Sequence, residues 1–396
     1  MANIAPPKYV KSILVTLQSH GHQAFLVGGC VRDMLMGIRP HDWDISTSAL
    51  PEQVMEIFPG SLPTGLRHGT VTVKLNSRKA EVTTFRSDGS YTDHRHPDMV
   101  SFVGDLTTDL SRRDFTMNAI ALSPDGLIAD PFDGESDIEK HIIRAVGPPQ
   151  QRFEEDALRM LRAVRFSAKL GFHIEDETLE AIRLHAPLAA EVAPERILAE
   201  LDKILLSPSP EMIFRLIDLG LIDSYLLKRP ESPAESSRIR LLPRKSLYRW
   251  TCFCVLLKKY GCIESVEDFL TGMRLDKRGI RCCRDAALVL NGPRPETSVE
   301  WKHLLNRYGV DTMLCAAACG DVLRGSGSTK ALKAVLKSGE CFSLRHLAVT
   351  GQDLLNLGLS GRELGEMLLF LLDYVMEFPE NNQRDLLLSL VKGTEE

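Results

Sequence analysis

The chain has 396 residues and a formal net charge of −5, with 44% hydrophobic and 26% charged residues. This length allows two or more domains, and the composition is that of a soluble globular protein. No apolar run approaches a membrane span, and the first residues lack the basic and apolar segments of a secretory signal.

The first informative segment is a strand that leads into a helix through two glycines. The apolar run 24–27 is typical of a buried strand, and a helix is predicted at 30–36. Gly28 and Gly29 lie between them, and Arg32 lies in the first turn of the helix. A helix N-terminus behind a Gly-Gly turn suits a phosphate, because free backbone N–H groups and the helix dipole both favour an anion.

A pair of carboxylates follows this turn. Asp42 and Asp44 are separated by one residue, so on a strand they would point to the same face of the sheet. Adjacent carboxylates repel each other unless a cation lies between them, and hard oxygen ligands suit Mg²⁺ bound together with substrate phosphates. An isolated Asp-x-Asp is more often an exposed turn, and the preceding Gly-Gly turn is what favours a metal site here.

The next segments predict a hairpin and a loop. Residues 70–75 and 80–85 alternate as two strands, which we expect beside the strand of Asp44. Glu81 is a candidate third carboxylate near the metal, although a strand Glu is more often simply exposed. Residues 86–111 are polar and predict a loop that contains a short strand.

From about residue 150 the pattern becomes helical and no further strand is predicted. Residues 153–170 predict one helix, with Asp156 near its start. Three arginines recur every three residues and would form a ridge along one side of this helix: Arg159, Arg162 and Arg165. Such a ridge is usually a solvated face with ion pairs.

Several of these segments resemble the motifs of one family. GGCVRD at 28–33 followed by Asp-Trp-Asp at 42–44 is similar to the first motif of the class II tRNA nucleotidyltransferases and bacterial poly(A) polymerases. These proteins belong to the DNA polymerase beta-like nucleotidyltransferase superfamily. Later segments are similar to further motifs of the family: RRDFTMNAIA at 112–121, DPFDG at 130–134, EDALR at 155–159 and PERILAEL at 194–201.

The resemblance implies an α+β fold, in which a DNA polymerase beta-like nucleotidyltransferase domain with a mixed sheet and helices precedes all-α neck, body and tail domains. We expect a catalytic head at 1–148, a neck at 149–206, a body at 207–325 and a tRNA-binding tail at 326–396. Residues 271–345 carry 13 Lys and Arg against 7 Asp and Glu, which fits a surface that meets a phosphate backbone. Alone, that balance fits a solvated helical face equally well.

The resemblance also implies roles for individual residues. Asp42 and Asp44 would be catalytic and would bind Mg²⁺. Seven residues would bind the nucleotide: Gly29, Arg32, Arg113, Asp156, Arg159, Arg162 and Arg165. In the family the Glu-Asp-x-x-Arg signature reads the incoming base. A carboxylate can accept a hydrogen bond from an exocyclic amine, and a neighbouring arginine can donate one to a ring acceptor. Cytosine and adenine present this pair of groups, whereas uracil and guanine present the opposite pattern. DPFDG and PERILAEL are expected to have structural roles.

The implied activity is template-independent addition of the 3′-terminal CCA to tRNA from CTP and ATP, with release of pyrophosphate. The partners would be CTP, ATP and the 3′ end and acceptor region of tRNA, with no membrane, and a homodimer is compatible with this. CC-adding, A-adding and poly(A)-polymerising relatives share these motifs and stay open as alternatives, although the loop at 86–111 favours full CCA addition. A non-catalytic RNA-binding module is disfavoured because Asp42, Asp44 and Arg113 are intact.

The nine cysteines are scattered and have no zinc-finger spacing. Free cysteine packs readily as a small hydrophobic residue. We therefore expect reduced, mostly buried thiols and a cytoplasmic enzyme.

Overall fold

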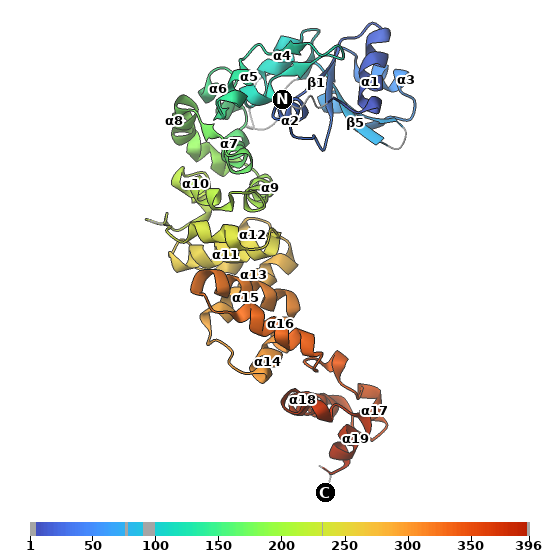
Figure 1. The fold of residues 1–396 in the computed structure, drawn as a ribbon, viewed down its shortest axis with the longest axis vertical. Coiled ribbons are helices and arrows are strands. Elements are labelled where there is room, and N and C mark those ends of the chain that lie inside the picture. Colours follow the sequence, from blue (N-terminus) through green and yellow to red (C-terminus); the bar gives the residue numbers. More distant parts are fainter. Residues whose placement is uncertain (1–4, 76–77, 90–99, 232, 394–396) are drawn as a thin grey trace. The chain divides into compact units, whose positions relative to one another are not determined.

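The computed structural model describes residues 5–75, 78–89, 100–231 and 233–393. Contacts divide the chain into two compact units, Met1–Ser224 and Tyr225–Glu396. The elements of both units are drawn in Figure 1. The first unit contains a mixed sheet with helices, and the described residues of the second unit contain helices and no strand. This arrangement confirms the α+β class. The finer division into head, neck, body and tail stays a prediction.

The first unit contains a seven-stranded sheet with the order β3-β4-β5-β2-β1-β8-β9. Its strands are β1 (Ala24–Val27), β2 (Asp44–Thr47), β3 (Leu62–Gly65), β4 (Thr70–Leu75), β5 (Arg78–Thr84), β8 (Ala121–Leu122) and β9 (Ile128–Ala129). β2 and β5 run parallel, and the other neighbouring pairs are antiparallel. Two small sheets accompany it: β6 (Arg86–Asp88) with β7 (Val100–Phe102), and β10 (Ile142–Ile143) with β11 (His173–Ile174).

Two expectations about strands are wrong. β11 lies beyond residue 150, and its two residues are too short a segment to produce a periodic pattern. Asp42 is not on a strand, because β2 begins at Asp44 and Asp42 lies in a bend. Trp43 between them is buried, and its carbonyl accepts a hydrogen bond from the Glu81 N–H at 3.2 Å. The chain is therefore already aligned beside β5 before β2 starts.

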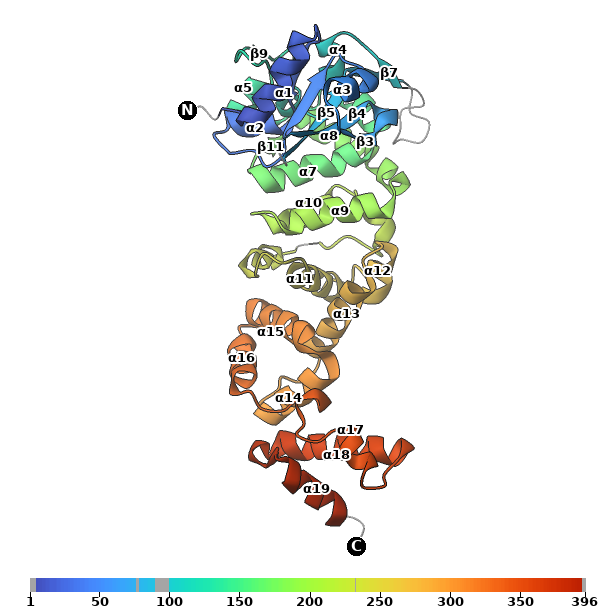
Figure 2. The ribbon, with the colours of Figure 1, turned by 90° about the vertical axis from the view of Figure 1, so that its right-hand side faces the viewer.

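Helices of the first unit flank the sheet and then continue beyond it along the chain (Figures 1 and 2). They are α1 (Lys8–Ser19), α2 (Gly29–Leu35), α3 (Pro51–Ile57), α4 (Leu106–Ser111), α5 (Gly134–Glu139), α6 (Pro149–Glu155), α7 (Leu158–Leu170), α8 (Asp176–His185), α9 (Pro194–Leu205) and α10 (Ile213–Asp218). α1 packs on β1, α3 packs on β4 and β5, and α7 packs on α9. Of the loop predicted at 86–111, residues 90–99 lie outside the described residues, and the rest forms β6, β7 and α4.

The single helix predicted at 153–170 is wrong, because the chain breaks between α6 and α7. Asp156 has extended backbone angles (φ −146°, ψ 101°). Its side chain accepts a hydrogen bond from the Leu158 N–H at 3.1 Å. Asp156 therefore ends α6, and its carboxylate satisfies the free N–H of the first residue of α7.

The described residues of the second unit form a helical array. Its α-helices are α11 (Ser246–Lys259), α12 (Val266–Gly272), α13 (Lys277–Asn291), α14 (Ser298–Tyr308), α15 (Val310–Arg324), α16 (Ser328–Ser338), α17 (Gly351–Leu355), α18 (Gly361–Glu377) and α19 (Arg384–Gly393). Trp250 and Phe253 of α11 are fully buried where α11, α13 and α15 pack together. Leu371, Leu372 and Val375 of α18 form a separate core nearer the C-terminus.

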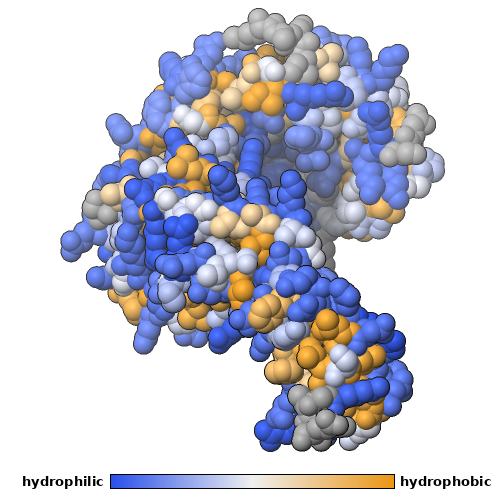
Figure 3. All heavy atoms as spheres, turned by 60° about the horizontal axis from the view of Figure 1, so that its bottom comes forward, coloured by the Kyte–Doolittle hydropathy of each residue, from blue (hydrophilic) through white to orange (hydrophobic). Residues whose placement is uncertain are grey.

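The surface of the protein is mostly hydrophilic on the face drawn in Figure 3. Hydrophobic side chains gather in smaller clusters on this face. No helix in the described part of the chain is both long enough and apolar enough to cross a membrane.

All nine cysteines are free and buried, which confirms the prediction of buried thiols.

The DPFDG segment starts α5. The Asp130 carboxylate accepts hydrogen bonds from the N–H groups of Gly134 and Glu135, both at 2.8 Å. A Cβ on Gly134 would overlap the carbonyl oxygen of Thr116 and lie 2.8 Å from Cγ1 of Ile120. Glycine therefore permits the close approach of α5 to the segment that follows Arg113.

We expect Gly134→Ala to lower the free energy of unfolding by about 1–3 kcal/mol, because the added methyl group overpacks this contact. Urea denaturation of the full chain measures it. Gly104→Ala is the matched control, since a Cβ there would meet no atom within 4 Å. It should change the free energy by less than about 0.5 kcal/mol. Equal effects of the two substitutions would contradict the packing role of Gly134.

Candidate functional site

A cavity of about 410 Å³ lies in the first unit, where the β1–α2 turn, the segment after α4 and helices α7 and α9 meet. Eight basic side chains and three carboxylates line it: Arg32, Arg112, Arg113, Arg159, Arg162, Arg165, Lys169 and Arg196, with Asp44, Asp114 and Asp156. A cleft lined mainly by one sign of charge concentrates ligands of the opposite sign. This cavity therefore suits a polyphosphate.

The structure brings eight of the nine predicted site residues to this cavity. They are Gly29, Arg32, Asp44, Arg113, Asp156, Arg159, Arg162 and Arg165. Asp42 is the exception: it is exposed in the bend before β2 and is not part of the lining. It still affects the charge of Asp44, as described below.

The Gly-Gly turn packs tightly against the charged residues. Gly28 precedes α2 with φ +73°, a conformation that disfavours L side chains. A Cβ on Gly28 would lie 2.9 Å from Nη1 of Arg113 and 3.8 Å from Oδ2 of Asp44. A Cβ on Gly29 would make only an ordinary contact, 3.5 Å from Nη2 of Arg32. Gly28, which the sequence interpretation did not assign to the nucleotide, is thus the glycine that the geometry requires.

The carboxylates around the start of β2 repel one another. Asp44 is paired in register with Glu81 on the parallel strand β5. Burial raises the pKa of Asp44, the charges of Glu81 and Asp42 raise it further, and Arg113 opposes them. A divalent cation would relieve this repulsion, so the residues fit one. Among the described residues, no three His, Cys, Asp or Glu side chains form a ready metal cage. Mg²⁺ often needs only one or two carboxylates, because substrate phosphates complete its shell.

Arg113 is held from behind by a buried acid. Asp109 is fully buried and accepts hydrogen bonds from Arg112 (2.7 Å), Ser46 (3.1 Å) and Arg113 (3.4 Å). Although burial acts to raise it, Arg112 and Arg113 hold the pKa of Asp109 below its usual value. The buried Nε of Arg113 has no hydrogen-bond partner in the described part of the chain. Arg113 thus retains donor capacity for a ligand.

The arginine ridge of α7 is anchored at two further acids. Arg162 pairs with Asp114 at 2.6 Å. Although burial acts to raise it, this arginine and a hydrogen bond from Asn118 hold the pKa of Asp114 at about 2. Arg165 pairs with Glu200 of α9, and its guanidinium lies 3.9 Å from the centroid of the Phe166 ring. The ridge is therefore a fixed wall of the cavity.

The two residues of the expected base-reading pair are held by different elements. Asp156 accepts two hydrogen bonds from Arg196 of α9, at 2.8 and 3.2 Å. Arg159 donates to Glu155 at 2.6 Å and to the carbonyl of Arg112 at 2.9 Å. Arg196 belongs to the PERILAEL segment, for which a bracing role by charge pairs is predicted, and the structure places its guanidinium against Asp156.

Sequence interpretation missed several residues of the lining: Gly28, Arg112, Asp114, Asn118, Leu158, Phe166, Lys169 and Arg196. Two signals were available for some of them. Lys169 follows Arg165 by one helical turn, and Asp114 and Asn118 lie four residues apart in a recognised motif. Asn118 accepts a hydrogen bond from Nη1 of Arg32 at 2.7 Å, and burial lowers the pKa of Lys169.

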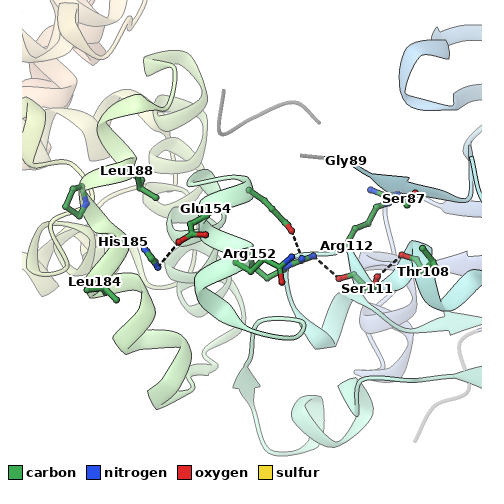
Figure 4. Close-up of a pocket in the computed structure, with 13 residues that line it drawn as sticks. Ser87, Gly89, Thr108, Ser111, Arg112, Arg152, Glu154, Leu184, His185 and Leu188 are labelled. Carbon is green, nitrogen blue, oxygen red and sulfur yellow. Dashed lines mark hydrogen bonds and ion pairs between the residues drawn. The ribbon is translucent and has the colours of Figure 1, made fainter. Parts of the chain in front are cut away.

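A second cavity of about 850 Å³ lies beside the first and shares Arg112 with it (Figure 4). Arg152 extends along this cavity and donates to the carbonyl of Ser111 at 3.0 Å. Arg152 also pairs with Glu155, the same carboxylate that binds Arg159. The wall of the second cavity therefore positions Arg159, one residue of the expected base-reading pair.

Known proteins resemble this chain over nearly its whole length. The family model described as "Poly A polymerase head domain" matches residues 24–144, and the one described as "Probable RNA and SrmB- binding site of polymerase A" matches residues 171–231. A CCA-adding enzyme of Geobacillus sp. is 40% identical over 352 residues, which cover 87% of this chain and 85% of that relative. The chain belongs to the CCA-adding enzyme family. It is therefore a nucleotidyltransferase.

Other members of the CCA-adding family agree. The enzyme of Enterococcus faecalis is 34% identical, with 97% of this chain and 95% of the relative covered. The crystal structure of the Bacillus stearothermophilus CCA-adding enzyme in complex with CTP has a TM-score of 0.79 and 34% identity, with 94% of each chain covered. The Thermotoga maritima CCA-adding enzyme complexed with tRNA, at 22% identity and a TM-score of 0.67, shows the fold alone.

For this CCA-adding family member we expect Gly28→Ala to lower the free energy of unfolding by about 1–3 kcal/mol, because it forces a side chain into a positive-φ position. Gly29→Ala is the adjacent control and should be neutral or slightly stabilising, since alanine is favoured in a helix. Thermal and urea unfolding measure both. A larger loss for Gly29→Ala would show that the tight approach is not at Gly28.

Proposed function

We propose that this chain adds the 3′-terminal CCA to tRNA without a nucleic-acid template, using CTP and ATP and releasing pyrophosphate. The observation that carries the proposal is one cavity in which Asp44, the Gly28–Gly29 turn and the basic ridge of α7 converge. The curated relatives that are 34–49% identical are CCA-adding enzymes, which favours this activity over CC-adding, A-adding and poly(A)-polymerising alternatives.

Asp42 and Asp44 would hold Mg²⁺, with Glu81 as a third carboxylate close to Asp44. When bound, the cation supplies charge neutralisation for the triphosphate and favours the deprotonated 3′ oxygen of tRNA. The protein supplies orientation. Asp44 lies at the edge of the cavity beside Arg113, so the reacting phosphate would lie between them.

The phosphate chain would lie along the basic wall. The N–H of Gly29, at the start of α2, and the guanidinium of Arg32 would bind one end of the triphosphate. Arg113, Arg162 and Arg165 would bind the remaining oxygens. Forked guanidinium donors hold phosphates with defined geometry, which suits in-line transfer.

Base selection would rest on Asp156 and Arg159. A carboxylate beside a guanidinium matches the amine and ring nitrogen that cytosine and adenine share, and leaves unpaired groups against uracil and guanine. Arg196 and Glu155 would act as positioning residues, because they hold Asp156 and Arg159 respectively. No template strand is then needed to present this hydrogen-bonding pattern.

We expect Asp44→Asn to lower nucleotide addition by about a hundredfold or more while the circular dichroism spectrum is unchanged, because the metal loses a charged ligand. The assay is Mg²⁺-dependent incorporation of labelled CTP and ATP into a tRNA that lacks its CCA end. Asp125→Asn, in an exposed turn, is the control and should keep full activity.

The products of the wild-type assay test the proposed activity itself. Two C residues followed by one A are expected. A stop after CC, addition of A alone, or a long A tail would assign the chain to a sister activity. Normal turnover by Asp44→Asn would refute the metal site.

We expect Asp156→Ala to reduce the preference for CTP over UTP, measured as a ratio of kcat/KM values, by about tenfold or more, since the mismatched base no longer faces a partly buried carboxylate. Glu180→Ala, on the exposed face of α8, is the control and should leave the ratio unchanged. An unaltered ratio in Asp156→Ala would refute the base-reading role.

A further inference from the structure

Six of the nine cysteines lie in three helices of the second unit that pack against one another. They form pairs along the chain: Cys252 and Cys254 in α11, Cys282 and Cys283 in α13, and Cys315 and Cys319 in α15. All six are buried and carry free thiols. The proposed nucleotide addition, which uses residues of the first unit, gives these thiols no role.

Contacts near both ends of α13 and α15 determine how the two helices are aligned. Near their starts, Arg278 pairs with Asp311 at 2.5 Å, 33 residues further along the chain. Near their ends, Arg324 donates to the carbonyl of Leu290 at 2.6 Å, and these two residues are 34 positions apart in the sequence. Because the offset is nearly constant, the helices run side by side in the same direction with a fixed register.

This register places Cys282 opposite Cys315. Each cysteine follows the ion-paired residue of its own helix by four positions, about one helical turn. The Cys315 side chain is also close enough to influence the titration of the Cys282 thiol. Small buried residues line the same two helices and allow their backbones to approach closely: Ala286, Ala287, Ala316 and Gly320. Close backbone approach is what disulfide geometry requires.

Cys282 is also the more reactive thiol of the pair. Hydrogen bonds with Cys315 and Thr312 lower the pKa of Cys282 to about 7, against the effects of burial and of the Asp311 and Asp285 carboxylates. Cys283 beside it has its pKa raised to about 12 by burial. Since the thiolate is the attacking species, exchange would begin at Cys282.

We propose that Cys282 and Cys315 form a reversible intramolecular disulfide by exchange with a low-molecular-weight disulfide. The Cys282 thiolate attacks one sulfur of the small disulfide, which forms a mixed disulfide and releases the first small thiolate. Cys315 then loses its proton and attacks the Cys282 sulfur, releasing the second small thiolate. The two protein thiols lose two electrons, the small disulfide gains them, and the two protons end on the two small thiols released.

The bond would link α13 directly to α15 and close a loop that contains α14. A cross-link of this kind restricts the unfolded chain, so the oxidised second unit should unfold at a temperature several degrees higher. Addition of a reducing thiol should reverse the shift.

The test is treatment of the full chain with oxidised glutathione, followed by alkylation of free thiols, proteolysis without reduction and mass spectrometry. A cross-linked peptide pair containing Cys282 and Cys315 is expected, and it should disappear on reduction. Cys315→Ser should stop at a glutathione adduct on Cys282, whereas Cys282→Ser should leave Cys315 unmodified. Cys341→Ser, which removes a buried thiol of another cluster, should give the same cross-link as the wild type.

Three outcomes would overturn the proposal. The cross-link could join Cys252 to Cys319, which also lie on two helices that pack together, α11 and α15. Glutathione could react first at a cysteine other than Cys282. All nine thiols could stay reduced unless urea unfolds the chain. None of these results depends on nucleotide addition. The assay of CCA synthesis therefore tests the proposed function, and the thiol chemistry tests the disulfide separately.

Discussion

Mutual repulsion among eight cationic side chains around one cavity is the constraint on which the site depends. Each arginine that lines the cavity is held by a carboxylate beside or behind it, and without these carboxylates the like charges would push the wall apart. The structure provides these acids: Asp33 for Arg32, Asp109 for Arg112 and Arg113, Asp114 for Arg162, Glu155 for Arg159, Glu200 for Arg165 and Asp156 for Arg196. Removal of one partner from a buried pair is strongly destabilising, because it leaves an uncompensated charge. A bound triphosphate would supply the negative charge that these acids do not.

These acids explain why the family motifs are spread along the chain. Asp109 lies in α4, Glu155 ends α6 and Glu200 lies in α9, yet their arginines face one cavity. Each ion pair therefore fixes a helix as well as a side chain. The sheet supplies Asp44 and the Gly28–Gly29 turn, and the helices supply the wall opposite. Substitution of a supporting acid should consequently disturb the site as much as substitution of a ligand-facing arginine.

Residue patterns over short stretches of sequence predict the parts of the site that are formed by neighbouring residues. The strand at 24–27, the Gly-Gly turn and the spacing of the α7 arginines follow from residues near each other in sequence. The break at Asp156 was not predicted, because a helical period continues through it. The Asp156–Arg196 pair joins residues 40 positions apart, and no periodicity carries that information. Asp42 was assigned to a strand because alternation does not show where pairing with β5 begins.

The remaining hydrogen-bonding capacity of the base-reading pair supports its proposed role. An ionised carboxylate has about four acceptor positions. Asp156 uses one for Leu158 and two for Arg196, so Oδ2 can still accept from an exocyclic amine. A guanidinium has about five N–H donors. Within the described residues Arg159 uses three, on the carbonyls of Arg152 and Arg112 and on Glu155, which leaves donors for a ring nitrogen. A free acceptor and free donors that line the same cavity would complement the edge that cytosine and adenine share. Because both side chains are already fixed, a matching base would meet a preorganised partner in the proposed role, and a mismatched base would not reorient it.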